Sequence, residues 1–358
     1  MYSVNTTADY RRRRNCVSQQ DENSPIKMMD APNRLDGSDA DLGAMMCDLE
    51  TGICGPADSA GVAEASSPLQ PVTFRPTQKI DVYYVTDPIC SHCWALEPTL
   101  RRFLEQYGRH LDVKTVMGGL LPAWSGFADG ANGIGGPADV AGHWREVGEA
   151  SRMPIDGSVW LRDPLSSSYP PSRVYVVIRE QDPQLAGLFL RRAREAVFAF
   201  DRNIANAAVL IELVDGLGLD GQTIVAEAES ARGEELLQRD LELARELGVR
   251  GFPTLVFVDD EGRGLKVSGV RGLGDYAEAL QDLIGSDSDL RLRELPSLSD
   301  VLDRDGRLFA REIEALFDIA PEALDEFTEK HLTEGSYQVG EVLGERYWQK
   351  TSEVGAAN

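Results

Sequence analysis

From position 80 onward, the apolar residues follow the pattern of a β-α-β unit. Residues 80–85 form a short apolar run typical of a buried strand, and residues 111–117 form a second one. Between these runs, apolar residues recur at helical spacing over 91–107, and Gly108 is expected to end that helix. Pro98 lies inside the helix and is expected to kink it, because proline removes a backbone donor.

A long helical stretch follows, and the chain then returns to strands. Its segments rich in Leu, Ala, Arg and Glu are separated by turn signals and lie at 183–200, 205–217 and 222–247. An apolar strand follows Pro253, a second strand is expected at 265–270, and a helix at 273–284. The pattern therefore predicts an α/β domain over residues 77–285, with a helical insertion at about 137–248.

The end of the chain predicts a separate small unit. Residues 286–298 are a polar linker, and the unit occupies 299–350. Its expected elements are a helix at 307–317, a turn at 318–321, a helix at 322–332 and a hairpin at 337–349. This order is winged-helix-like. The candidate recognition helix carries Glu322, Asp325, Glu326 and Glu329, which would repel DNA, so a protein-docking or packing module is predicted.

Residues 1–76 lack apolar periodicity and are expected to form a disordered leader. Met45 and Met46 offer an alternative start within it. Its basic run, Arg11 to Arg14, is either a nucleic-acid arm or a solvated tail. The chain carries 59 acidic against 36 basic residues, a net charge of −23, which disfavours nucleic acid and anionic membranes as partners. We therefore interpret the run as a solvated tail.

The cysteine usage and the absence of a secretory signal predict a cytoplasmic protein. All five cysteines fall within the first 93 residues, so no disulfide framework spans the fold. The N-terminus has no charged-then-apolar signal pattern, and no apolar run approaches the ~18 residues of a membrane helix. Neither secretion nor membrane insertion is supported by the sequence.

Cys90 and Cys93 form a Cys-x-x-Cys motif where the first strand breaks on Asp87-Pro88 and the helix begins. A Cys in the first helical turn meets unpaired N–H groups and the positive end of the helix dipole, and both favour the thiolate. Cys90 is therefore the expected nucleophile, and Cys93, one turn later, the expected resolving thiol. His92 can add positive charge or a hydrogen bond to the Cys90 thiolate, which favours an oxidising pair.

Half of a zinc site and an inert structural pair are the alternatives for this motif. No second Cys-x-x-Cys or His-x-x-x-His follows it, and its strand-to-helix position is the one that a thioredoxin-type redox motif requires. His143, Trp144 and Trp160 are interpreted as packing residues, since no second His lies near enough in sequence to form a metal pair. No metal and no organic cofactor are expected.

Cys47 and Cys54 form a second candidate redox pair. Six residues separate them, around a Glu-Thr-Gly turn. They are close enough to pair with each other, or to meet the Cys90 sulfur if the segment folds back. Two free thiols and a metal clip are the alternatives.

Residues 118–136 contain seven glycines, with Trp124 and Phe127 among them. The stretch lacks the Gly-Lys-Ser/Thr and Gly-x-Gly-x-x-Gly patterns of phosphate-binding loops. It is expected to be a surface loop, and the alternative is a mobile loop beside the active site whose aromatic side chains contact a substrate.

Pro253 predicts an unusual backbone turn. A proline directly before an apolar strand cannot donate to the strand ladder and constrains the residue before it. A cis peptide bond at Phe252-Pro253 resolves this conflict, and a trans proline that starts a strand is the alternative. The cis turn would set the Phe252 backbone against Cys90 and offer its N–H and C=O to an incoming chain.

These features together resemble the DsbA branch of the thioredoxin superfamily over roughly residues 79–285. Further motifs are similar to those of the SpxH (YjbH) family. They are Asp87-Pro88-Ile89-Cys90, Cys93-Trp94-Ala95-Leu96-Glu97-Pro98, Val159-Trp160, Asp163-Pro164-Leu165-Ser166-Ser167, Gly264-Leu265-Lys266-Val267, Arg311-Glu312-Ile313 and Tyr347-Trp348. They are dispersed over about 270 residues, which makes a chance match a poor explanation.

The resemblance implies a DsbA-like thioredoxin fold, with Cys90 and Cys93 as the redox pair and Pro253 as the cis-proline. It also implies a role as an adaptor that presents the transcription factor Spx to the ClpXP protease, although no contact residue for that role can be carried over. The sequence thus supports a thiol-disulfide oxidoreductase or an adaptor. A glutathione-dependent isomerase is the weaker alternative, because this chain has a Cys-x-x-Cys in place of a lone active-site Ser or Cys.

Overall fold

The computed structural model describes residues 45–47 and 54–56 as strand backbone, and residues 79–125, 130, 133–285 and 290–351. The chain divides into two units, Met1–Thr77 and Gln78–Asn358. In the first unit, β1 (Met45–Cys47) pairs antiparallel with β2 (Cys54–Pro56), and the backbone of Cys47 lies opposite that of Cys54. The rest of the predicted leader, including its arginine run, lies outside the described residues.

The second unit is built on a four-stranded mixed sheet. Its strands are β3 (Ile80–Thr86), β4 (Leu111–Met117), β5 (Thr254–Val258) and β6 (Gly264–Ser268). They lie in the order β4-β3-β5-β6, with β3 and β4 parallel and the other neighbours antiparallel. The strand that follows the predicted proline turn therefore pairs directly with the strand that precedes the Cys-x-x-Cys, and this arrangement confirms the predicted thioredoxin fold.

Helices cover both faces of this sheet because its central strands are apolar on both sides. On one face, Val82 and Tyr84 pack with Phe103 of α1 (Ser91–Tyr107) and Tyr276 of α9 (Leu273–Ile284). On the other face, alternate strand residues such as Val85 pack against α8 (Ala231–Glu246). Such two-sided burial is expected for a strand whose neighbour is parallel. A 3-10 turn, Gly108–His110, ends α1.

The insertion is helical, as the sequence predicts. Besides α8, its helices are α2 (Pro137–Ser151), α3 (Val159–Arg162), α4 (Tyr169–Gln181), α5 (Pro183–Arg194), α6 (Ala207–Asp215) and α7 (Gly221–Glu229). The expectation of one helix over 222–247 is wrong, because Ser230 is extended and its side chain caps α8 by accepting from the Arg232 N–H. The expected helix over 183–200 also changes character, since its last part, Glu195–Ala199, is a π-helical turn.

Residues 298–350, here called the C-terminal unit, have their own hydrophobic core around Ile313 and Trp348. Its elements are α10 (Leu298–Asp305), β7 (Arg307–Phe309), α11 (Ala310–Phe317), a 3-10 turn (Pro321–Ala323), α12 (Leu324–His331), β8 (Tyr337–Val342) and β9 (Glu345–Lys350). One expectation is wrong here, because residues 307–309 pair with β9 and the predicted helix at 307 therefore begins as a strand. The helix α10 is an additional element that the sequence does not predict. The winged-helix-like assignment stays a prediction.

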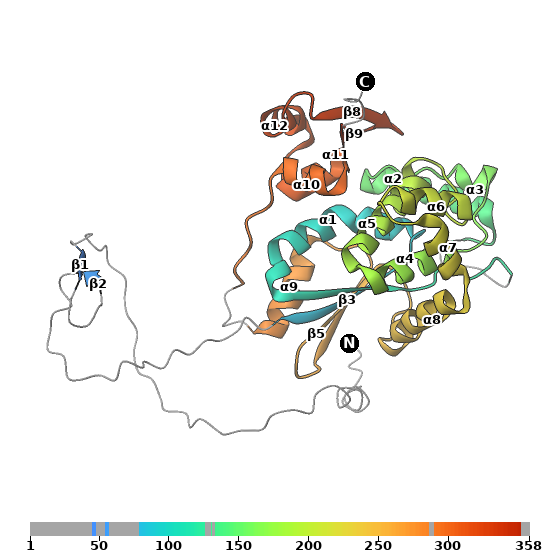
Figure 1. The fold of residues 1–358 in the computed structure, drawn as a ribbon, viewed down its shortest axis with the longest axis horizontal. Helices are drawn as coiled ribbons and strands as arrows, with labels where there is room; N and C mark the ends of the chain where they lie inside the picture. Colours follow the sequence, from blue (N-terminus) through green and yellow to red (C-terminus); the bar gives the residue numbers. More distant parts are fainter. Residues whose placement is uncertain are drawn as a thin grey trace. The chain divides into compact units, whose positions relative to one another are not determined.

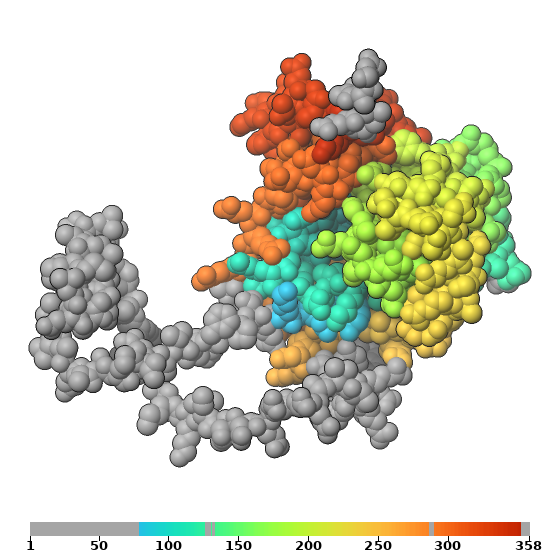
Figure 2. Space-filling view, in the orientation of Figure 1, coloured from blue at the N-terminus to red at the C-terminus, as the bar shows by residue number. Residues whose placement is uncertain are grey.

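The C-terminal unit lies directly on the helix that carries the Cys-x-x-Cys. Figure 1 shows α10 and α11 over α1, and Figure 2 shows the orange-to-red C-terminal unit seated against the teal and green surface. Trp94, next to Cys93, is fully buried, and its indole N–H donates to the Pro154 carbonyl at 3.1 Å. Its ring lies edge-on to Phe309 of the C-terminal unit, with 5.8 Å between centroids.

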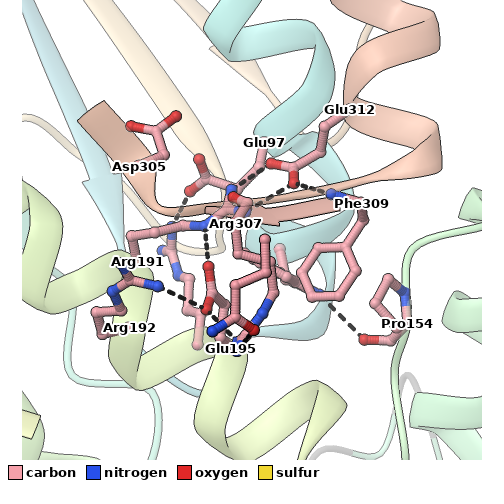
Figure 3. A network of polar contacts seen from close by, with 12 residues as sticks. Glu97, Pro154, Arg191, Arg192, Glu195, Asp305, Arg307, Phe309 and Glu312 are labelled. Carbon is pink, nitrogen blue, oxygen red and sulfur yellow. Dashed lines mark hydrogen bonds and ion pairs between the residues drawn. The ribbon is translucent and has the colours of Figure 1, made fainter. Parts of the chain in front are cut away.

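A buried ionic network reinforces this contact (Figure 3). Arg191 of α5 donates to both carboxylate oxygens of Glu312 in α11, at 2.7 Å for Oε2, and its guanidinium lies 5.0 Å from the Trp94 ring centroid. Arg191 also donates to Glu195 at 2.7 Å, and Glu195 in turn accepts from Arg307 of β7 at 2.8 Å. The ion pairs of Arg191 with Glu312 and of Glu195 with Arg307 exist only while the C-terminal unit is docked.

Asp87, at the end of β3, joins three segments that surround the Cys-x-x-Cys. Its buried carboxylate accepts from the Ile89 N–H at 3.0 Å, the Leu120 N–H at 2.8 Å and the Ser168 hydroxyl at 2.8 Å. Burial raises the pKa of Asp87 to about 6, and these hydrogen bonds together with Arg194 oppose the rise. The junction is therefore fixed by a carboxylate that is costly to ionise.

The raised pKa of Asp87 predicts a pH-dependent stability. The folded protein keeps the proton up to about pH 6, whereas the unfolded chain loses it near pH 3.8, so stability falls as pH rises through this window. Between pH 4.5 and 7.5, the wild type should lose about 2 kcal/mol of unfolding free energy that Asp87→Asn does not lose. Chemical denaturation at both pH values measures this difference. The exposed control Asp163→Asn should keep the wild-type slope; an unchanged slope in Asp87→Asn contradicts the assignment.

The Arg191–Glu312 pair predicts a large stability loss on neutralising its acid. Glu312→Gln removes one of the two carboxylates that compensate the buried Arg191 and leaves Glu195 as the other, which should cost about 3 kcal/mol of unfolding free energy. Glu326→Gln, on an exposed position of α12, is the matched control and should change stability by less than about 0.5 kcal/mol. Urea denaturation measures both variants, and limited proteolysis reports whether the C-terminal unit is released. Equal midpoints for Glu312→Gln and the wild type would show that the pair does not hold the unit.

Candidate functional site

Cys90 and Cys93 are free thiols at the N-terminal end of α1. Cys90 is the N-cap residue, and its sulfur accepts a hydrogen bond from the Cys93 N–H at 3.4 Å. Cys90 is 6% exposed and Cys93 is fully buried, so an approaching substrate meets Cys90 first. The local fold follows from the sequence, because Asp87-Pro88 ends β3 and turns the chain into the helix.

The Cys93 sulfur lies in a pocket of hydrogen-bond donors and positive charge. Burial by itself would raise the pKa of Cys93, but hydrogen bonds with Cys90, Thr86 and the Asp87 backbone, together with the Arg194 charge, hold it below its ordinary value. Arg194 is fully buried and contacts Glu97, the Thr86 hydroxyl and the Asp87 carbonyl, the last at 3.3 Å. A guanidinium stays charged when buried, so a permanent cation faces the resolving thiol.

The pKa of Cys90 shifts in the opposite direction to that of Cys93 in the reduced protein. Its hydrogen bond with Cys93 and its burial raise the pKa of Cys90 well above its ordinary value, and the nearby Asp87 charge acts in the same direction. The tertiary environment therefore makes Cys93 the more acidic of the two thiols in the reduced protein. The role of Cys90 as nucleophile stays a prediction.

His92 lies on the exposed side of the motif and pairs with His143 of α2. The two rings are 5.3 Å apart between centroids. Burial, and then the neighbouring His143, lower the pKa of His92 below its ordinary value of 6.5, so His92 is mainly neutral at pH 7. A neutral His92 adds no positive charge beside Cys90 at pH 7, but its ring N–H can still donate a hydrogen bond.

A cavity of about 510 Å³ opens beside Cys90. Its wall includes aromatic side chains from four different segments, namely Trp124, Trp144, Trp160 and Phe252. Trp144 and Trp160 are buried, as expected for packing residues, and meet edge to face at 5.3 Å between centroids. They also line the cavity, which their interpretation as packing residues did not include. Trp124, from the glycine-rich loop, continues the contact at 5.8 Å from Trp160, while Phe127 lies outside the described residues.

The Phe252–Pro253 peptide bond is cis, as the sequence predicts. Phe252 and Cys90 both line the cavity, so the proline turn and the thiol border one space although 162 positions separate them. The carbonyl of Pro253 accepts from the Gly269 N–H at 2.8 Å, which fixes the turn to the end of β6. The use of Phe252 and Pro253 to bind a substrate chain stays a prediction.

The sequence also raised the questions of a second cysteine pair, a metal site and a membrane-spanning helix. The possible pairing of Cys47 with Cys54 stays a prediction, since only the backbone of these residues is described. Within the described ranges, no cluster of three or more His, Cys, Asp or Glu side chains could hold a metal ion, and no helix is long and apolar enough to cross a bilayer.

Two residues whose roles the sequence did not reveal lie at the centre of the site. Asp87 begins the Asp87-Pro88-Ile89-Cys90 motif, and a carboxylate directly before a turn can indicate a side chain that accepts hydrogen bonds from the turn backbone. Arg194 has no such signal, because it lies 101 positions after Cys93 in a helix whose arginines look solvent-exposed. Only the packing of α5 against the β3–α1 junction brings it to the thiols.

The chain is similar to proteins of known family. Residues 83–278 match the family model Thioredoxin_5, described as thioredoxin. The ClpXP adapter protein SpxH of Halalkalibacterium halodurans is 31% identical over 230 residues, which cover 64% of this chain and 75% of that protein. SpxH of Shouchella clausii is 30% identical over 280 residues, which cover 77% of this chain and 87% of that protein.

Among solved structures, the cytosolic disulfide reductase DsbM from Pseudomonas aeruginosa is 25% identical, with a TM-score of 0.44 over 57% of this chain and 95% of that one. The family model spans more than half of the chain, and it includes both cysteines and the cis-proline. The two SpxH proteins match this chain along most of their lengths. The chain therefore belongs to the thioredoxin family and, within it, to the SpxH family.

Proposed function

We propose that this protein is a cytoplasmic thiol-disulfide oxidoreductase that acts through Cys90 and Cys93 on protein or small thiols. The observation that carries the proposal is the position of the pair. Two free thiols lie at the start of α1, one of them on the wall of a cavity that the cis-proline turn also borders. A buried cation, Arg194, beside the inner thiol adds support.

In the first step, a client thiolate attacks the Cys90 sulfur of the Cys90–Cys93 disulfide. The S–S bond breaks, a mixed disulfide forms on Cys90, and Cys93 leaves as a thiolate. Arg194, the Thr86 hydroxyl and the Asp87 N–H stabilise that leaving thiolate. A thiol with a lower pKa leaves faster, so this environment favours the step.

In the second step, another client thiolate attacks the client sulfur of the mixed disulfide and releases Cys90. The client has then lost two electrons and become a disulfide, and Cys90 and Cys93 hold those electrons as a dithiol. An external disulfide must reoxidise the pair. Stabilisation of the reduced form by a charge beside Cys93 makes the pair a stronger oxidant, which supports client oxidation as the main direction.

The second candidate function is an adaptor that delivers a regulatory protein to the ClpXP protease. It is favoured by the names of two SpxH relatives, which are called ClpXP adapters, and by the 75% and 87% of their lengths that this chain covers. The docked C-terminal unit adds a surface that thiol exchange does not require. In this case the thiols would act at most as a redox sensor, and an Spx-like regulator would be the client.

One pull-down separates the two functions. Cys93→Ser cannot resolve a mixed disulfide that Cys90 forms with a client disulfide, so this variant should retain partners that only a reductant releases. Cys90→Ser is the matched control, because it keeps the other four cysteines and should retain no such partner. The measurement is mass spectrometry of proteins released by dithiothreitol from the full-length tagged variants.

The double variant Cys90→Ser, Cys93→Ser tests the adaptor role in the same experiment. An adaptor should still hold its regulator and the protease, and should still speed the turnover of the regulator. A complete absence of reductant-released partners on Cys93→Ser counts against the oxidoreductase. Unchanged turnover of every co-purified protein on deletion of the gene counts against the adaptor.

A further inference from the structure

The cavity beside Cys90 has a composition that the exchange of protein thiols does not explain. Its volume of about 510 Å³ lies within the range of small-molecule sites. Its flat aromatic walls come from Trp124, Trp144, Trp160 and Phe252, with aliphatic side chains such as Val140 between them. Rigid aromatic walls of this kind favour a planar aromatic ligand through stacked or edge-to-face contacts.

The polar side chains on the wall are all hydrogen-bond donors or cations. Apart from Cys90, they are Ser91, His92, His143 and Arg250, and no Asp or Glu is present among the lining residues that the structure describes. This is unusual in a chain with 59 acidic and 36 basic residues. The start of α1, a 17-residue helix, also opens on the cavity, and its dipole favours negative charge there.

We propose that this cavity binds a low-molecular-weight aromatic disulfide that carries a carboxylate on its ring. The ring packs against the aromatic wall of the cavity, and the carboxylate faces His143 and Arg250. This position sets a ligand sulfur against Cys90. The inference rests on the proposed function for its chemistry, because it names the class of external disulfide that reoxidises the pair.

The redox step balances without another reactant. The Cys90 thiol gives its proton to solvent and attacks one sulfur of the aryl disulfide, a mixed disulfide forms on Cys90, and the first aryl thiolate leaves. Cys93 then passes a proton to solvent and attacks the Cys90 sulfur, and the second aryl thiolate leaves. The pair becomes a disulfide, and its two electrons reside on two aromatic thiolates.

Binding can be measured apart from thiol chemistry. In the Cys90→Ser, Cys93→Ser protein, 2-naphthoate should quench the tryptophan fluorescence in a saturable manner, and 2-naphthamide, which lacks the charge, should bind about tenfold more weakly. Arg250→Gln in this background should remove most of that preference. Arg250 is exposed, so its replacement should leave the fold intact. Arg239→Gln, at an exposed position on α8 outside the cavity, should leave the preference unchanged.

The half-reaction is tested with 5,5′-dithiobis(2-nitrobenzoate) and its uncharged counterpart, bis(4-nitrophenyl) disulfide, on the otherwise unaltered full chain. The rate of each probe with the protein is first divided by its rate with a free thiol. On this scale the carboxylate probe should react about tenfold faster than the uncharged probe, and its rate should saturate with probe concentration. Arg250→Gln should slow the carboxylate probe alone. Equal binding of naphthoate and naphthamide, or no binding, overturns the cavity proposal even if thiol exchange is active. Selective naphthoate binding in a protein whose thiols exchange with no disulfide upholds the carboxylate site and overturns the proposed function.

Discussion

The contact between Arg191 and Glu312 is the interaction on which the arrangement of the second unit depends. It joins α5 of the insertion to α11 of the C-terminal unit, and the Arg191 guanidinium also lies over the Trp94 ring beside the redox pair. Buried opposite charges contribute little net stability when both are present, but each becomes costly when the other leaves. The pair therefore specifies one docked position for the C-terminal unit.

One helical turn supports both the redox pair and the docked unit. Arg191 and Arg194 lie in the last turn of α5, one directed to Glu312 and the other to Thr86 and Glu97 near Cys93. The π-helical turn that follows carries Glu195, which binds Arg191 and Arg307. Irregular turns of this kind often occur at functional sites. The oxidoreductase and adaptor proposals thus share one structural support, and a protein with both activities needs no separate scaffold for each.

The sequence predicted the local features of this protein well. The strand-helix-strand pattern, the Cys-x-x-Cys at a helix start, the Phe252–Pro253 turn and the helical insertion all follow from short-range periodicity or from proline chemistry. The boundary at Ser230 was missed, because a single cap residue inside a helical pattern carries a weak signal. The strand at Arg307 was missed for another reason, since its pairing partner β9 lies about 40 residues later.

The long-range electrostatics could not be predicted. Arg194 and Glu312 look like surface charges in the sequence, and only the packing of distant helices buries them. The same packing raises the pKa of Cys90 and lowers that of Cys93, whereas the helix dipole alone pointed to Cys90 as the more acidic thiol. Local rules describe the first turn of α1, and the tertiary structure decides which sulfur is more acidic.

The central claim is that Cys90 and Cys93 form a redox-active pair whose reduced form is stabilised by Arg194. The most direct measurement is the equilibrium of the full chain with glutathione buffers, followed by mass spectrometry of the Cys90–Cys93 disulfide. We expect one two-electron transition at a potential above the value of about −270 mV that is typical of thioredoxin, and a shift to lower potential in Arg194→Met. The absence of a Cys90–Cys93 disulfide at every glutathione ratio, or an identical potential in Arg194→Met, would contradict the account.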